Sequence, residues 1–152
     1  MKNQFYIRNS TNQKVPDDHL HLVNSKILQA FPPSDSLRQR LKDTRGLTDN
    51  QIDMFIANPI DRASVVGKVL STGGVQPDDL LYVPGFYLDE ESGGTGEDAI
   101  KFKTYLNTDC VIAVRNETGK VVALQARLKA TDSSPRYLWY SSKGRPGGAT
   151  SG

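Results

Sequence analysis

The sequence predicts an α+β fold in which a cluster of short N-terminal helices packs on a C-terminal antiparallel β-meander. Apolar residues recur at helical spacing through the first half of the chain, whereas residues 109–142 alternate apolar and polar positions around two polar breaks. A three-stranded meander needs a cover on its apolar face, and the upstream helices are the only material available. With 152 residues, the chain is long enough to bury such a core.

The first helix is expected to run for about four turns from Asp17 to Phe31. Two aspartates at its start suit a helix N-terminus, and the proline pair that follows ends the pattern. The positions expected to face the core are Leu20, Val23, Ile27, Leu28 and Phe31. His19 and His21 are expected to face solvent, because no further histidine or cysteine completes a zinc shell around them.

Three shorter helices are expected next, each preceded by a capping residue and followed by glycine or proline. The caps are Ser34, Thr48 and Asp61, and the segments are 35–42, 49–57 and 62–71. In the second of these, Gln51 has capping-box spacing, and Ile52 and Phe55 are expected to face inward. The first two have the layout of a helix-turn-helix, but residues 49–57 hold two aspartates and no cation, which argues against insertion into a DNA groove.

The second half of the chain is expected to be extended. Residues 80–88 are apolar but contain a Pro-Gly pair, which predicts two short pieces around a turn. The acidic segment 89–98 is expected to be a surface loop rather than a metal site, because nothing in it would fix its carboxylates. Residues 99–106 can form a short strand or helix. The meander strands are expected at 111–115, 120–128 and 136–140, with a turn at 116–119.

One domain is expected over residues 17–142, preceded by a flexible arm at 1–16 and followed by a flexible tail or linker at 143–152. The sequence has no run of bilayer-spanning length and no signal-peptide apolar segment at its start, which favours the cytoplasm and excludes a membrane partner. Cys110 is the only cysteine and no histidine lies near it in sequence. It is therefore expected to be a small buried hydrophobe rather than a catalytic thiol.

Basic residues gather in the last third of the chain. Residues 101–152 carry nine basic and three acidic side chains, a net charge of +6, against −4 for the first hundred residues. The same strands carry Tyr137, Trp139 and Tyr140. Because cations hold phosphates and rings stack on bases, one interpretation is a sheet that faces nucleic acid. The other is a solvated sheet face, which charge alone favours.

Several short motifs follow one another in a fixed order. They are Thr44-Arg-Gly-Leu-Thr-Asp-Asn-Gln-Ile52, Val83-Pro-Gly-Phe-Tyr87, Val111-Ile-Ala-Val-Arg115, Gly119-Lys-Val-Val-Ala123 with Gln125-Ala-Arg127, and Pro135-Arg-Tyr-Leu-Trp-Tyr-Ser-Ser142. Together they resemble the N-terminal subdomain of the bacterial DNA primase catalytic core, the region that precedes the Toprim domain. Over residues 34–152 the resemblance is closer to the primase-like proteins of plasmids, phages and integrative elements.

The resemblance implies an accessory N-terminal domain of a DNA replication protein that grips a single-stranded DNA template or a primer-template hybrid. The residues expected to bind nucleic acid are Arg115, Lys120, Arg127, Arg136, Tyr137, Trp139, Lys143 and Arg145. Ala113 stands where the family usually has proline, and Gln125 and Ala126 replace paired glycines, so the approach to the template is expected to differ.

The resemblance places magnesium only in a Toprim domain, which the tail at 143–152 would lead to. This chain has no Glu-Gly motif with a later Asp-x-Asp, so no cofactor, metal ligand or catalytic residue is expected in it. It belongs by resemblance to a primase-type nucleotidyltransferase, but by itself it is not expected to synthesise primers.

An alternative function is a protein-interaction module whose sheet docks a helicase, a polymerase or a Toprim catalytic subunit. In that case Tyr137 and Trp139 would anchor the interface and the cations would form its polar rim. An affinity that does not change with salt concentration, together with a requirement for a protein partner, would support this alternative. An independent hydrolase is disfavoured, because the sequence shows no nucleophile-base pair or ligand cluster.

Overall fold

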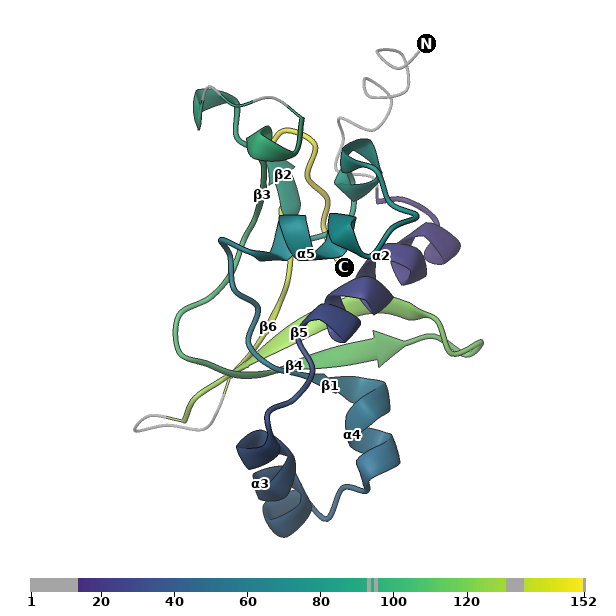
Figure 1. Ribbon diagram of the computed structural model, residues 1–152, viewed down its shortest axis with the longest axis vertical. Helices are drawn as coiled ribbons and strands as arrows, with labels where there is room; N and C mark the ends of the chain where they lie inside the picture. The colour runs from purple at the N-terminus through teal and green to yellow at the C-terminus, as the bar shows by residue number, and fades with distance from the viewer. Residues whose placement is uncertain (1–13, 93, 95, 131–135, 152) are drawn as a thin grey trace.

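The computed structural model describes residues 14–92, 94, 96–130 and 136–151. A four-stranded antiparallel sheet lies at its centre, with helices on both faces, and a separate two-stranded sheet stands to one side (Figure 1). The helices come mostly before the strands, which confirms the predicted α+β class. Most of the expected N-terminal arm, residues 1–13, lies outside the described residues.

Local capping signals fix the helices. They are α2 (Asp17–Ala30), α3 (Asp35–Arg45), α4 (Asp49–Phe55) and α5 (Val65–Ser71). The Ser34 hydroxyl accepts a hydrogen bond from the Leu37 N–H at 3.1 Å, and Gly46 ends α3 with a φ of 67°. Thr48 and Gln51 form the predicted capping box.

Two expectations about these helices are wrong. The last helix begins at Val65 rather than residue 62, because the Asp61 carbonyl accepts the Val65 and Ser64 N–H groups and residues 62–64 form a turn. Phe55 does not face inward: Ile52 alone is buried in α4. Phe55 is exposed, and the centre of its ring lies 5.8 Å from the Arg115 guanidinium carbon.

The central sheet contains β1 (Ile56–Ala57), β4 (Thr108–Arg115), β5 (Val121–Leu128) and β6 (Tyr137–Trp139), in the order β1-β4-β5-β6. The last three are the predicted meander. Strand β1 was not expected: the helix predicted at 49–57 ends at Phe55, and its last two predicted residues form β1, which is too short for a period to appear in the sequence.

Two rows of opposed residues cross the sheet and show its two faces. One row is Ala57, Val111, Ala126 and Leu138, and the next is Ile56, Ile112, Gln125 and Trp139. Opposed residues point to the same side of a sheet and neighbouring rows to opposite sides. The first row therefore faces the main core, which includes Val111 and Ala126, and the second faces away from it.

Helix α2 covers the main-core face, where it contacts β5, and α5 packs on α2 and on β3 as part of the same core (Figure 1). Asn24 of α2 is buried there, and its side-chain Nδ2 donates a hydrogen bond to the Val121 carbonyl at 3.2 Å. The preceding turn of the helix contacts the same strand, since His21 Nδ1 accepts the Val121 N–H at 3.0 Å. The prediction that His19 and His21 face solvent is wrong: both are half-buried, and His19 Nε2 lies 2.6 Å from the Asp79 carbonyl oxygen.

Helices α3 and α4 cover part of the opposite face. Their apolar side chains form a second cluster with β1 and β4, which contains Leu37, Leu41, Ile52, Ile56 and Cys110. Ion pairs link the two helices, because Lys42 and Arg38 of α3 both bond to Asp49 of α4. These two cations hold the pKa of the Asp49 carboxyl below its usual value. Strands β5 and β6 contribute no residue to this cluster.

The smaller sheet pairs β2 (Phe86–Leu88) with β3 (Ile100–Phe102). Between and before these strands lie the 3-10 turns η1 (Pro77–Leu80), η2 (Glu90–Ser92) and η3 (Gly96–Ala99). Gly85 precedes β2 with a φ of 104°, and a Cβ there would overlap the Phe102 ring. The close approach lets Phe86 and Phe102 pack edge to face, with ring centroids 4.7 Å apart.

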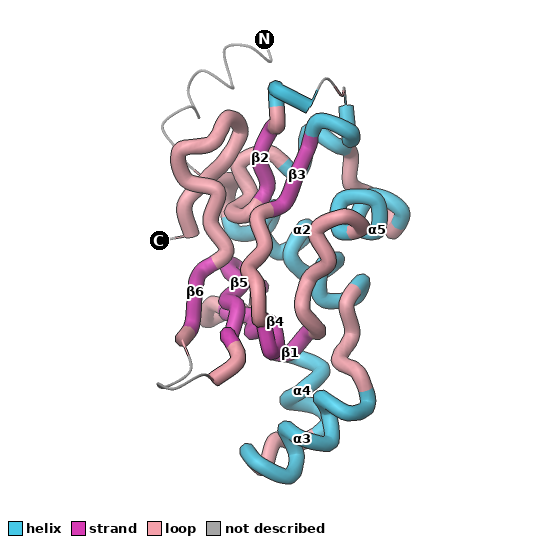
Figure 2. The backbone as a smooth tube through the Cα atoms, turned by 90° about the vertical axis from the view of Figure 1, so that its left-hand side faces the viewer, coloured by secondary structure: helices cyan, strands magenta, loops and turns pink. Residues whose placement is uncertain are grey.

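Residues 143–151 belong to the folded domain and do not form the flexible tail expected from their glycines. The Tyr82 N–H donates to the Gly147 carbonyl and the Leu88 N–H to the Pro146 carbonyl, each at 2.8 Å. The Ser142 N–H donates to Ala149, whose side chain is fully buried. Figure 2 shows this segment beside β2. Its glycines make turns rather than a linker, since Gly144 and Gly147 have positive φ.

Within the described residues, no helix has the length and apolar character needed to cross a lipid bilayer.

Candidate nucleic-acid interface

Two aromatic rings stand exposed on the sheet face that α3 and α4 leave partly open. Tyr137 and Trp139 lie two positions apart on β6, and 48% and 45% of their surfaces are exposed. Their neighbours Leu138 and Tyr140 point to the opposite face, where Tyr140 belongs to the main core and burial raises the pKa of its hydroxyl far above the ordinary value. We call Gln125, Arg127, Tyr137 and Trp139 the aromatic face, because β5 and β6 place them side by side.

Arg127 is incompletely bonded. It lies opposite Tyr137 on β6 and opposite Cys110 on β4. Its Nη1 is 3.7 Å from an Asp109 oxygen, beyond hydrogen-bond distance, whereas Arg40 donates to both Asp109 oxygens at 3.0 and 2.7 Å. Among the residues that the structure describes, none accepts a hydrogen bond from the buried Arg127 Nε. Arg127 therefore keeps hydrogen-bonding capacity for a ligand, and Asp109 stays neutralised by Arg40.

An apolar pocket of about 140 Å³ adjoins the aromatic face. It lies between the end of α3 and strands β1, β4, β5 and β6, and its lining is Leu41, Arg45, Leu47, Ile56, Cys110, Ile112, Arg127 and Tyr137. The two arginines and the Tyr137 ring are its polar members. We call this cavity the apolar pocket.

Cys110 lies in the lining of this pocket and matches its sequence-based expectation. It is buried, and burial, followed by the charge of Asp109, raises the pKa of its thiol to about 11. A thiol with such a pKa is protonated near neutral pH and is a poor nucleophile. Cys110 therefore contributes apolar surface to the site.

Arg115 and Lys120 lie at the other end of the β4–β5 hairpin, apart from the aromatic face. Arg115 donates from Nε and Nη2 to the Met54 carbonyl at 3.1 and 2.9 Å, and from Nη1 to the Gly119 carbonyl at 2.6 Å. Lys120 pairs with Asp18 in the first turn of α2. Both cations are thus engaged within the fold, and Arg115 joins the last turn of α4 to the hairpin.

Replacing Arg115 by alanine is expected to lower the free energy of unfolding by about 1–2 kcal/mol, because three charge-assisted hydrogen bonds to backbone carbonyls are lost. Urea unfolding would measure the loss. Arg136→Ala, which removes an exposed arginine from the other end of the sheet, is the control and should leave stability unchanged. If Arg115→Ala is as stable as the wild type, the three hydrogen bonds make no net contribution to the free energy of unfolding.

The remaining predicted cations divide between two places. Arg136 is exposed directly before Tyr137, but it lies opposite Leu128, whose side chain packs on the main core, so strand alternation directs Arg136 away from the face that carries Tyr137. Lys143 and Arg145 lie on the C-terminal segment, where the Arg145 guanidinium carbon is 4.5 Å from the centre of the Tyr87 ring. Three of the eight predicted residues therefore come together, namely Arg127, Tyr137 and Trp139.

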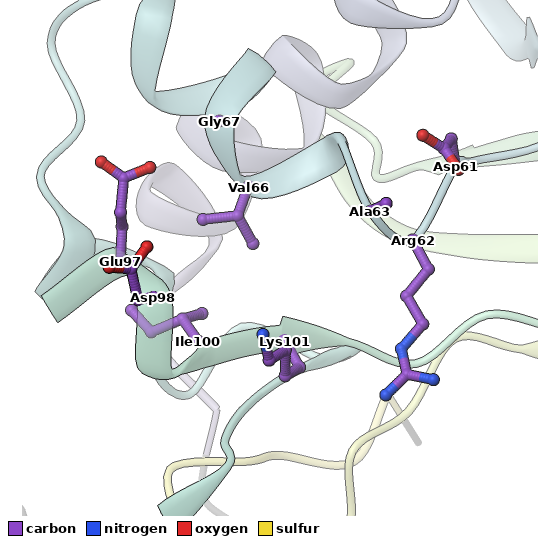
Figure 3. A pocket seen from close by; sticks show the side chains of 9 residues that line it. All are labelled: Asp61, Arg62, Ala63, Val66, Gly67, Glu97, Asp98, Ile100 and Lys101. Atoms are coloured by element: carbon purple, nitrogen blue, oxygen red, sulfur yellow. The ribbon is translucent and has the colours of Figure 1, made fainter. Parts of the chain in front are cut away.

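A larger cavity of about 590 Å³ opens between the start of α5 and β3 (Figure 3). Side chains of both charges line it: Arg62 and Lys101 are basic, and Asp61, Glu97 and Asp98 are acidic. None of the eight predicted residues and no aromatic ring lies in its lining. Its mixed charge does not suit a polyanionic strand, which makes the aromatic face the better candidate.

Sequence reasoning missed Arg40, Arg45, Leu47 and Ile112 at this site. The basic character of residues 38–45 is visible in the sequence, but only the fold brings α3 beside Arg127. Among the described residues, no group of three or more His, Cys, Asp or Glu side chains could hold a metal ion.

The sequence matches no protein-family model, and neither a curated protein nor a solved structure is significantly similar to it.

Proposed function

We propose that this protein binds single-stranded nucleic acid on its aromatic face, as the accessory domain of a primase-like replication protein of a mobile element or phage. One observation supports this most strongly: Tyr137 and Trp139 are exposed side by side on β6, next to Arg127 on β5. Rings left exposed on a sheet can stack on bases of any sequence, and neighbouring cations can hold the phosphates between them.

The spacing of the two rings suits an extended strand. Residues two apart on a β-strand are roughly 6–7 Å apart along it, whereas stacked bases in a duplex strand rise about 3.4 Å each. A strand that stacks successive bases on Tyr137 and Trp139 would therefore be pulled out of its helical form. This geometry favours single strands over duplexes.

The primase part of the proposal is supported by the sequence motifs. Gln125–Arg127 and Pro135–Ser142, two of the segments that resemble the primase subdomain, contribute all four residues of the aromatic face. The bound strand would be the template or the primer-template hybrid. Magnesium and nucleotidyl transfer would come from a Toprim domain, and this chain would bind the strand without catalysing the reaction.

A docking role for the same surface is favoured by Leu106, whose surface is 88% exposed. It follows Tyr105, whose hydroxyl donates to the Trp139 carbonyl at 2.7 Å, so the segment that carries Leu106 is bonded to β6. A helicase, polymerase or Toprim subunit could use Leu106 with Trp139 as anchors.

Titration of a fluorescently labelled oligothymidine separates the two functions. Binding should weaken steeply with salt, with a log–log slope of about −0.7 for each phosphate contacted. Trp139 is the only tryptophan, so its intrinsic fluorescence should be quenched in step with the anisotropy change. No binding at low salt, or binding without a change in Trp139 emission, would refute nucleic-acid binding at this face.

A further inference from the structure

We infer that the apolar pocket receives one pyrimidine base of the bound strand, turned out of the row of bases that stack on the aromatic face. This inference rests on the proposed function. It adds a base-selective subsite to a surface whose stacking alone would be indifferent to sequence.

The size of the pocket fits one small ring. At about 140 Å³ it is below the range of roughly 300–1,000 Å³ typical of sites for whole small molecules. It is well above the roughly 30 Å³ that a water molecule occupies, and an apolar protein cavity of about 150 Å³ is known to hold one benzene ring. A six-membered pyrimidine ring therefore fits, whereas a two-ring purine would crowd the walls.

The position of the pocket makes it reachable from the aromatic face. Tyr137 belongs to both, because it lines the pocket and is half exposed on β6. The floor is apolar: Leu41, Leu47, Ile56 and Ile112 surround the buried Cys110. A base that leaves the stack beside Trp139 would pass Tyr137 and come to rest on these side chains.

The charges at the pocket suit the backbone of such a strand. Arg45 is exposed at the end of α3 and Arg127 approaches from β5, so cations lie on two sides of the opening. Arg127 has only the 3.7 Å contact with Asp109 to give up, and Asp109 would keep both hydrogen bonds from Arg40. A phosphate next to the inserted base can therefore recruit Arg127 without leaving a buried carboxylate unpaired.

Filling the pocket tests the inference. Leu47→Phe adds a ring to its half-buried wall and is expected to weaken oligothymidine binding about tenfold, the loss of one base contact. The salt dependence should not change, since no cation is removed, and the ratio of oligothymidine to oligodeoxyadenosine affinity should fall toward one. Leu22→Phe, the same change at an exposed site on α2, is the matched control and should bind as wild type.

The outcomes distinguish the subsite from the proposed function. If Leu47→Phe keeps wild-type affinity and base preference while Trp139→Ala loses binding, the face binds the strand and the pocket inference is overturned. If Trp139→Ala also has no effect, the proposed function fails. A readout on the unaltered protein guards against misfolding of the variant: oligothymidine should shift the methyl NMR signals of Leu47, Ile56 and Ile112, and unshifted signals at saturation would overturn the inference.

Discussion

Removing Arg127 and Arg136 together should weaken oligothymidine binding by tenfold or more and flatten its salt dependence. Each phosphate contact on a single strand contributes about 0.7 to the log–log salt slope, so the loss of two contacts should reduce the slope by about 1.4. The expected cause is electrostatic, because Arg127 lies opposite Tyr137, Arg136 is exposed directly before it in the chain, and neither is held by a short ion pair within the described residues. Anisotropy titrations of Arg127→Ala/Arg136→Ala at several salt concentrations would measure both effects.

A second double variant controls for net charge. Arg62→Ala with Lys68→Ala removes two exposed cations beside and on α5, which lies on the other side of the sheet. It should bind oligothymidine almost as wild type does. The fold of the first variant should also be preserved, because Arg40 continues to hold Asp109. Equal losses in the two variants would show that binding follows total charge and does not use the aromatic face.

Gly148→Ala should be the most destabilising of the substitutions considered, with a loss on the order of 3 kcal/mol in the free energy of unfolding. A Cβ at this position would overlap the Ser142 carbonyl oxygen and approach the Arg145 carbonyl oxygen to 3.0 Å. These are backbone atoms, so no side-chain rotation relieves the overlap. The C-terminal segment would have to move, and the buried Ala149 with it.

Gly144→Ala is the matched control in the same segment. Gly144 has a φ of 82° but open space around its Cβ position, so only the strain of a left-handed alanine is expected, about 1 kcal/mol. Thermal or urea unfolding of both variants would compare them. A loss no larger in Gly148→Ala than in Gly144→Ala would mean that residues 143–151 are not packed as part of the domain.

The features predicted correctly from the sequence are those with local causes. The Ser34 cap and the capping box of Thr48 and Gln51 depend on residues three positions apart, and both appear where they were expected. Alternation along residues 136–140 is also seen, since Leu138 and Trp139 point to opposite faces of β6, although Leu138 is only half-buried and Trp139 is exposed, so that neither is buried. Such signals are contained within one turn or one strand.

The features missed have partners far along the chain. Strand β1 exists only because Ile56 and Ala57 meet β4, more than fifty residues later. The glycines after residue 143 suggest flexibility when seen alone, and their packing depends on Tyr82 and Leu88. Arg115 resembles a surface cation until α4 brings the Met54 carbonyl to it. For the same reason, the apolar pocket could not be anticipated from any single segment.

The hydroxyl of Tyr105 closes the open edge of the central sheet. Strand β6 is the last strand, and the backbone groups of Tyr137 and Trp139 point away from β5, where a strand from another molecule could pair with them. Tyr105 already occupies the Trp139 carbonyl at 2.7 Å, so such a strand would have to displace it. Edge-to-edge polymerisation is thereby opposed, and the exposed rings remain available across the broad side of the sheet rather than along its rim.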